Sequence, residues 1–281
     1  MRKRFAIGVS LVGLLLTAGP VFSADMALKA PPLPVPVPYD WSGFYVGANG
    51  GYGWDPANLS FNPAAFASAI LGPFGGPYVV TGSSGPISLS VNPQGWLGGV
   101  QLGYDWQRGA AVYGVEADFD GAAINGSTSA PFFVTGTLGG DIADFTGNVG
   151  LTQKIDFLST LRGRLGWASD NVLLYGTGGF AWGHVITSVN TFGIKEAAAG
   201  QFSPAQLAAL QVGASSDSFR YGFAVGAGIE WALAHNWSIR GEYLFIDLLG
   251  GPGTLGIPGG AVSFSYLPIQ VVRLGFNYQF H

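Results

Sequence analysis

The chain has 281 residues with 46 glycines, no cysteine, 14% aromatic residues and only 10% charged residues, and its formal net charge is −4. Soluble proteins carry about 25% charged residues and nucleic-acid-binding domains are typically basic, so this composition argues against both classes. The mean hydropathy is +0.34, yet no apolar run reaches the roughly 20 residues that a transmembrane helix needs. Without cysteines there is no disulfide framework, and the sequence predicts apolar surface spread over the alternating strands of a membrane β-barrel.

The first 24 residues have the three parts of a secretory signal peptide. Three basic residues precede an apolar stretch from Phe5 to Leu16, and small residues follow up to Ala24. The apolar stretch is too short to span a bilayer. We therefore expect residues 1–24 to be removed during export, with cleavage after Ser23 or Ala24. A retained N-terminal anchor is the alternative.

A proline-rich segment follows the predicted cleavage site. Residues 30–38 read APPLPVPVP. Proline has no backbone N–H and cannot complete a sheet ladder, and proline-rich linkers are extended spacers. We assign residues 25–40 to a periplasmic leader and residues 41–281 to an outer-membrane β-barrel domain. A recognition motif for a proline-binding partner is the alternative for the leader.

Eight stretches of the remaining chain alternate with a period of two, as strands with two different faces do. The clearest runs from Phe219 to Trp231, where large apolar residues at odd positions alternate with Arg220, glycines, Ala224 and Glu230. We predict that the apolar set faces lipid and the other set faces the lumen. The eight predicted strands lie within residues 44–54, 96–106, 113–120, 157–167, 171–184, 219–231, 237–245 and 272–280.

Short and long connections alternate strictly between these strands. Three are tight, at residues 107–110, 168–171 and 232–235, and four are long, at residues 55–94, 121–151, 185–217 and 249–267. Outer-membrane barrels have short periplasmic turns and long extracellular loops. The predicted fold is therefore all-β: an eight-stranded antiparallel transmembrane barrel with both termini in the periplasm. A soluble β-sandwich is the alternative.

Two of the long connections contain helix signals. Asn62-Pro63 precedes AAFASAIL and Gly72, and Ser203-Pro204 precedes AQLAAL and Gly213. Each offers an N-cap residue, a proline at the first helical position and a glycine beyond the end. We predict two short helices that pack over the barrel mouth. Contact with a receptor is the alternative role.

The predicted lumen carries charged residues of both signs in similar number. An eight-stranded barrel is just wide enough for side chains to fill, and isolated buried charges are costly. We predict a salt-bridged plug in which Glu116 lies near Arg162 and Glu242 near Arg273; an ion-selective ring would show an excess of one sign. The predicted network consists of Asp105, Glu116, Asp118, Asp120, Arg162, Arg164, Arg220, Glu230, Arg240, Glu242 and Arg273.

Signals for catalysis, metals and cofactors are weak. His184 and Ser188 share a strand face near the outer leaflet, where a lipid-modifying enzyme would need them, but no third residue is seen that would orient the imidazole. Asp141 and Asp144 have no further metal ligands near them in sequence, and the three histidines are scattered. We expect no catalytic residue, no metal site and no cofactor.

Several motifs carry a resemblance to a known family. DWSGFYVGANGGYGW (residues 40–54), GWLGGVQLGYDWQ (95–107), TLRGRLGWA with NVLLYGTGGFAWG (160–183) and VRLGFNYQF (272–280) are quoted as they stand in this chain. They resemble the small outer-membrane proteins of alphaproteobacteria, the rhizobial and brucella-type barrels of the porin-like, opacity-type superfamily. The resemblance covers the mature chain and implies a location in the cell outer membrane.

The last predicted strand has a second role implied by the resemblance. Family members commonly end in phenylalanine, on an alternating aromatic strand that the barrel-assembly machinery reads. This chain differs from that pattern by adding His281 after the last phenylalanine. The matching residues are Val272, Leu274, Phe276, Tyr278 and Phe280.

These features predict a non-catalytic envelope protein with surface-exposed loops. Its expected partners are outer-membrane lipid and lipopolysaccharide, the barrel-assembly machinery and possible surface ligands of the long loops, with no nucleic acid among them. A narrow porin-like diffusion channel is the first alternative, and a lipid-modifying outer-membrane enzyme is the second.

Overall fold

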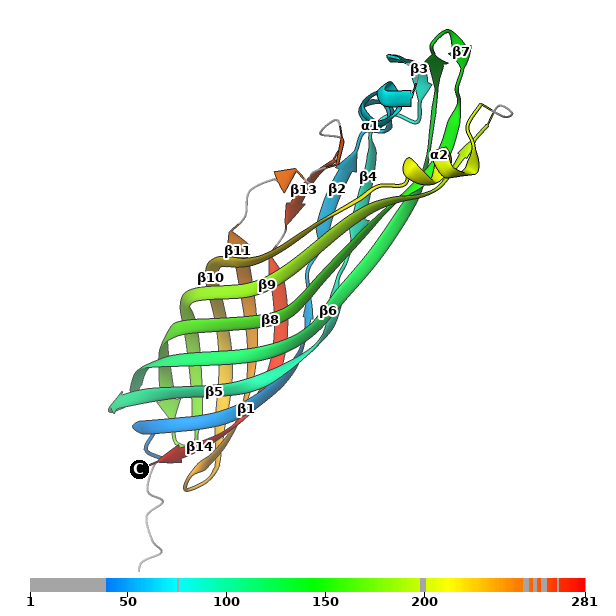
Figure 1. Ribbon diagram of the computed structural model, residues 1–281. Helices are drawn as coiled ribbons and strands as arrows, with labels where there is room; N and C mark the ends of the chain where they lie inside the picture. Colours follow the sequence, from blue (N-terminus) through cyan, green and yellow to red (C-terminus); the bar gives the residue numbers. More distant parts are fainter. Residues whose placement is uncertain are drawn as a thin grey trace, which may run out of the picture. The chain divides into compact units, whose positions relative to one another are not determined.

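The computed structural model describes residues 39–74, 76–197, 201–249, 253–254, 257–258, 262–266 and 268–280. The predicted signal peptide with its cleavage site, most of the predicted leader and His281 lie outside these residues. The elements in chain order (Figure 1) are β1 (Gly43–Trp54), β2 (Ala57–Phe61), α1 (Pro63–Leu71), η1 (Gly72–Phe74), β3 (Tyr78–Ser83), β4 (Ile87–Val91), β5 (Gln94–Arg108), β6 (Ala111–Leu138), β7 (Asp141–Ile142), β8 (Phe145–Ser169), β9 (Val172–Glu196), α2 (Pro204–Ala209), β10 (Gly213–Ala234), β11 (Trp237–Leu249), β12 (Gly253–Thr254), β13 (Val262–Tyr266) and β14 (Ile269–Phe280).

Eight antiparallel strands of the described chain pair into a closed ring. Their order is β6-β5-β1-β14-β11-β10-β9-β8, and β8 pairs with β6 to complete the circle. The first and last strands meet along their whole length, from Phe44 opposite Phe280 to Trp54 opposite Gln270. Closure leaves no unpaired edge within the ring, which is how barrels satisfy backbone groups in lipid. The predicted eight-stranded barrel is confirmed.

The three predicted tight turns are also present. Each links two ring strands through two residues, at 109–110, 170–171 and 235–236. Gly109 and Asp170 have positive φ angles of 61° and 52°, the left-handed region that glycine adopts freely and aspartate adopts more readily than most residues. Local sequence therefore specifies this end of the barrel.

Two of the four predicted long loops are largely strand. β6 and β8 leave only residues 139–144 between them, where β7 lies, and β9 and β10 continue well beyond the predicted strand ends. The prediction for residues 121–151 and 185–217 was wrong because their outward positions carry serine, threonine and asparagine, as loops do. Their inward positions, such as Val149, Leu151 and Val189, are buried, and this burial keeps the strands paired.

The other two long connections contain short elements. β12, β13, β2 and β4 form a second antiparallel sheet. Both predicted helices are present: Asn62 caps α1 by accepting a hydrogen bond from the backbone of Ala65, and Ser203 forms a capping box with Gln206 at α2. The cap signals in the sequence therefore located both helices correctly.

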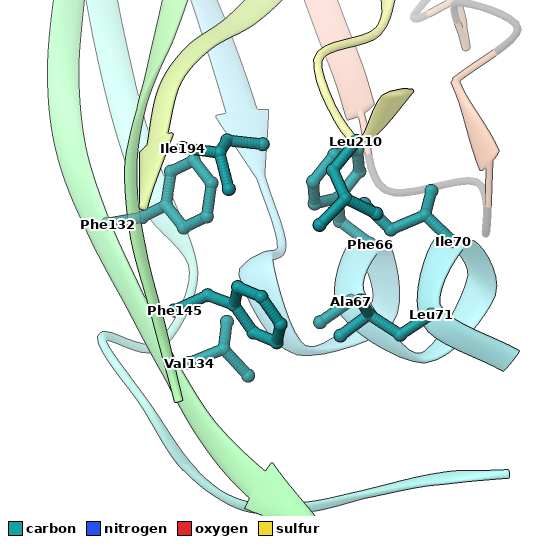
Figure 2. A pocket seen from close by; sticks show the side chains of 9 residues that line it. All are labelled: Phe66, Ala67, Ile70, Leu71, Phe132, Val134, Phe145, Ile194 and Leu210. Carbon is teal, nitrogen blue, oxygen red and sulfur yellow. The ribbon is translucent and has the colours of Figure 1, made fainter. Parts of the chain in front are cut away.

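Apolar side chains inside the described chain form three separate clusters at successive levels along the strands. The turn-end cluster contains Trp41, Val112, Ala168, Leu173, Tyr175 and Ala232. The middle cluster includes Leu97, Ile124, Ile155, Leu158, Leu244 and Val271. The third cluster joins α1 to the extended parts of β6, β8 and β9, and Figure 2 shows Phe66 and Leu71 of α1 facing Phe132, Val134 and Phe145.

A small cavity lies within this third cluster. Its volume is about 10 Å³, and every residue that lines it is apolar, so it has room for about one water molecule but offers that molecule no polar partner. It is a gap in a packed core rather than a ligand site. Within the described residues, no helix has the length and apolarity to cross a membrane.

Candidate functional site

The outward face of the ring is an apolar band. Trp96, Leu165 and Leu274 leave 73%, 68% and 64% of their surfaces exposed, which is costly in water and favourable in lipid. Phe119, Trp182 and Tyr221 lie at one register level, near the end of the band that lies away from the tight turns. Beyond them the outward residues of β6 are Asn125, Ser127 and Ser129. The predicted lipid face is therefore present on every ring strand.

The inward face carries the predicted charges. Alternation places Glu116, Asp118 and Asp120 of β6 on one face, two residues apart, and does the same for Arg162 and Arg164 of β8. The remaining members come from β5, β10, β11 and β14. Ten of the eleven predicted residues are no more than 5% exposed, the eleventh being Arg220.

Arg162 is at the centre of the larger of two charge groups. Its guanidinium lies 2.6 Å from Glu116, 3.0 Å from Asp118 and 2.8 Å from Glu242, measured between nitrogen and carboxylate oxygen. Its Nε also donates a 2.8 Å hydrogen bond to Thr160. One arginine thus joins β6, β8 and β11 across the lumen, and the predicted pair with Glu116 is confirmed.

Arg273 and Arg240 extend this group across the other side of the barrel. Arg273 of β14 contacts Glu242 at 2.8 Å, Asp118 at 2.9 Å and Asp120 at 3.1 Å, so the second predicted pair, Glu242 with Arg273, is also confirmed. Arg240 forms an ion pair with Glu116. Multiple partners for each charge are what a buried network needs to offset the cost of desolvation.

The second group is smaller and closer to the tight turns. Arg164 pairs with Asp105 at 3.1 Å and with Glu230. Its guanidinium carbon also lies 3.9 Å from the ring centroid of Tyr175, within cation–π range. Asn277 donates a 2.8 Å hydrogen bond to Glu230. This group lies between the larger group and the turn-end apolar cluster.

Arg220 is separate from both groups. It lines a small cavity of about 10 Å³ with Asp55 and Gln153, on the far side of the middle apolar cluster from the other charges. Gln153 donates a 2.5 Å hydrogen bond to Asp55. Sequence alternation placed Arg220 correctly on the inward face, but only the fold shows that it lies at a different level.

Uncharged lumen residues complete the network, and the sequence analysis did not single them out. The hydroxyl of Tyr45 donates to Glu116 at 2.6 Å and that of Thr160 to Asp118 at 2.7 Å. Gln101 donates to Asn277 and accepts from Arg240. Alternation along each strand places these residues on the inward face, and this could have identified them, because a polar residue inside a filled barrel needs a hydrogen-bond partner.

Glycine on the inward face makes room for these side chains. A Cβ atom added at Gly103 would lie 2.5 Å from the ring of Tyr45, and one at Gly114 would lie 2.0 Å from Oδ1 of Asp105. Neither position can hold a larger residue while its neighbour stays in place. The glycine richness of the chain therefore reflects, in part, how tightly the lumen is filled.

His184 has partners that the sequence analysis did not foresee. Its Nδ1 lies 2.7 Å from Asp156 and its Nε2 lies 2.6 Å from Asp217. The interpretation that nothing orients this imidazole was wrong, because the two carboxylates come from neighbouring strands whose register the sequence does not reveal. Among the described residues, no group of three or more metal-ligating side chains is placed to hold a metal ion.

The closed antiparallel ring, the apolar outside and the polar, filled inside together define a transmembrane β-barrel. This class follows from the structure itself. The described chain fills the barrel with its own side chains at each of the levels described above.

Comparisons with known proteins agree with this class. The chain belongs to the family described as outer membrane protein beta-barrel domain, which matches residues 21–280. It is 31% identical to the 31 kDa outer-membrane immunogenic protein of Brucella melitensis, over 92% of each chain. It is 27% identical to a 22 kDa outer membrane protein of Rhizobium leguminosarum, over 88% of this chain and 82% of the relative. The protein is therefore an outer-membrane protein, as its resemblance to alphaproteobacterial barrels predicted.

Among solved structures, the outer membrane protein OprG from Pseudomonas aeruginosa matches 86% of this chain and 98% of its own. The sequence identity is 13% and the TM-score is 0.38.

Proposed function

We propose that this protein is a non-catalytic, non-conducting barrel that has a structural role in the outer membrane and presents its extended strands and helices at the cell surface. The observation that carries the proposal is the filled lumen. A solute would have to displace Arg162, Arg240 and Arg273, which are each 1–2% exposed and held by several carboxylates.

The stacking of layers supports the same proposal. The charge groups lie between the turn-end cluster and the middle cluster, so an ion would meet an apolar layer on either side of them. Apolar constrictions oppose the passage of hydrated ions. Charges of both signs are paired across the lumen, whereas an ion-selective filter would present a ring of charges of one sign.

Recording of single-channel currents in planar bilayers tests this proposal. Purified wild-type protein is expected to give no sustained conductance, whereas Arg162→Ala should give leak currents because it opens the network. Arg108→Ala, at an exposed position beside a tight turn, is the matched control and should behave as wild type. Steady, ion-selective conductance of the wild type that persists in Arg162→Ala would show that the charges line an open path.

The non-catalytic part of the proposal has its own test. Lipid A from cells that express wild type or His184→Ala is compared by mass spectrometry, because His184 with its two carboxylates is the described group most like a catalytic one. We expect no protein-dependent change. A modification present with the wild type and absent with the variant would make the protein an enzyme.

The proposal includes contacts with the envelope. The apolar band would contact outer-membrane lipid, the polar outward residues beyond it would contact lipopolysaccharide, and the alternating aromatic face of β14 would be read by the barrel-assembly machinery. On β14, Val272, Leu274, Phe276 and Phe280 are exposed on the lipid face. By the usual orientation of such barrels, the helices and extended strands are extracellular and available to surface ligands.

A further inference from the structure

A cluster of ionisable side chains lies on the outward face, at the outer edge of the apolar band. His184 of β9 is opposite Phe157 of β8 and Phe219 of β10, one register level beyond Trp182. From there β8, β9 and β10 continue as the extended strands. The cluster therefore lies where three neighbouring strands leave the membrane.

A β-bulge brings Asp156 into this cluster. The register between β8 and β9 shifts between Ile155 and Phe157, so Asp156 lies outward next to Phe157 instead of inward. Bulges re-aim side chains in this way, and they are often found at barrel rims. The bulge places the Asp156 carboxylate 2.7 Å from Nδ1 of His184.

The second ring nitrogen of His184 also faces a carboxylate. Asp217 of β10 lies 2.6 Å from Nε2 of His184, and the ring of Phe219 lies 4.8 Å from the imidazole, centroid to centroid. Within the part of the chain that the structure describes, Lys154 of β8 is the remaining charged group that faces the cluster, with its Nζ 3.7 Å from Asp156. The charged groups around His184 are thus two carboxylates and one ammonium, on the strands at either side.

Two carboxylates at hydrogen-bond distance require two N–H donors. A neutral imidazole has one N–H and one lone pair, whereas the protonated ring donates from both nitrogens. We propose that Asp156, His184 and Asp217 form an acid-tightened latch that holds β8, β9 and β10 together where they leave the membrane. When His184 is neutral, one carboxylate faces a lone pair and the latch opens on that side.

The electrostatics of the cluster have the sign that this latch requires. Hydrogen bonds to Asp156 and Asp217 raise the pKa of His184 above its ordinary value of 6.5. Its contribution is therefore complete below pH 6.5 and is lost as the pH rises through the raised pKa. The hydrogen bond from His184 lowers the pKa of Asp156 from 3.8, so the contribution of Asp156 is present above that value and is lost on further acidification.

The latch would act on the surface-exposed part of the molecule. The segment from Val185 to Ser218 includes the extended halves of β9 and β10 with α2 between them. Within it, β10 pairs with β9 from Gly213 opposite Asn190 to Ser218 opposite Val185, and the latch lies at the base of this paired stretch. Mild acid is expected to hold this segment more tightly than neutral or alkaline solution does.

Hydrogen–deuterium exchange of the folded full-length protein tests the latch. Exchange of backbone amides in residues 185–218 is measured at about pH 5.5 and about pH 8, on either side of the histidine range, and corrected for the intrinsic pH dependence. Wild type is expected to exchange about two- to fivefold more slowly at the lower pH. His184→Gln should lose this difference, because glutamine does not titrate. His235→Gln, in the tight turn at the other end, is the matched control and should keep it.

A second measurement does not depend on any variant. The ring resonances of His184 in wild type are followed by NMR during a pH titration, with His235 observed in the same sample. The proposal expects His184 to titrate above the ordinary value and to show both ring nitrogens protonated below its midpoint. It is overturned if His184 titrates at about 6.5, or if His184→Gln retains the same pH-dependent exchange as wild type.

Discussion

Replacing Arg162 by alanine is expected to lower the free energy of unfolding of the barrel by about 3–5 kcal/mol. Arg162 is 1% exposed and contacts Glu116, Asp118 and Glu242 at 2.6–3.0 Å. Its loss leaves these three carboxylates with fewer cations in a site that water hardly reaches. Because Arg162 is so little exposed, water screens these ion pairs very little. Removing one partner of a buried ion pair also costs more free energy than the intact pair contributes.

The charge count of the network makes this substitution more severe. The two charge groups contain six carboxylates and four guanidiniums: Asp105, Glu116, Asp118, Asp120, Glu230 and Glu242 with Arg162, Arg164, Arg240 and Arg273. Removing one of the four arginines enlarges an existing excess of acidic groups. A second substitution, Glu242→Gln, removes one of the three carboxylates that lose a cation in Arg162→Ala. It should recover part of the loss, with a coupling energy of about 0.5–3 kcal/mol.

The assay is urea unfolding of the refolded barrel in lipid vesicles, followed by tryptophan fluorescence. Arg108→Ala is the control for removal of an exposed arginine and should change stability by less than about 0.5 kcal/mol. A loss below about 1 kcal/mol for Arg162→Ala, or no coupling with Glu242→Gln, would show that water enters the lumen and screens the network. Either result would exclude a closed lumen.

Two other predictions follow from the lipid face and the third apolar cluster. Phe223→Arg places a charge on the apolar band and should cost about 2–4 kcal/mol in vesicle unfolding, whereas Phe223→Leu should cost little; equal losses would contradict the face assignment. Phe66→Ala removes a ring that is 1% exposed beside Phe61 and Phe132 and should destabilise the third apolar cluster by about 3–5 kcal/mol. Limited proteolysis should then cut within residues 55–94, while the barrel keeps the heat-modifiable gel migration of a folded barrel. Unchanged protease resistance would mean that this cluster does not depend on α1.

Part of the lumen arrangement was predictable from parity, and part was not. Alternation alone assigned Glu116, Arg162 and Arg273 to the inside. The pairs of Glu116 with Arg162 and of Glu242 with Arg273 were predicted by counting from the strand ends, and both are present. The counting could not show that Arg162 also reaches Glu242 on β11, because contacts across the lumen depend on the shear of the whole barrel.

The extended strands show a different limit. The outward positions of residues 121–151 and 185–217 are polar enough to read as loops, although they are strand. What decides their structure is the burial of their inward side chains against α1 and the second sheet, which are distant in sequence. Asp156 likewise contacts His184 only because a bulge shifts the register by one residue. Such a shift moves a side chain to the other face of the sheet, and the amino-acid composition does not reveal it.

The sequence by itself therefore determined the ring strands, their two faces, the three tight turns and the two helix starts. All of these depend on periodicity or on cap and turn residues within a few positions of one another. The tertiary structure alone decided how far the strands extend, which charges share one lumen network and that His184 lies between two carboxylates. These features depend on register, shear and packing between segments far apart in the chain, which no local pattern records.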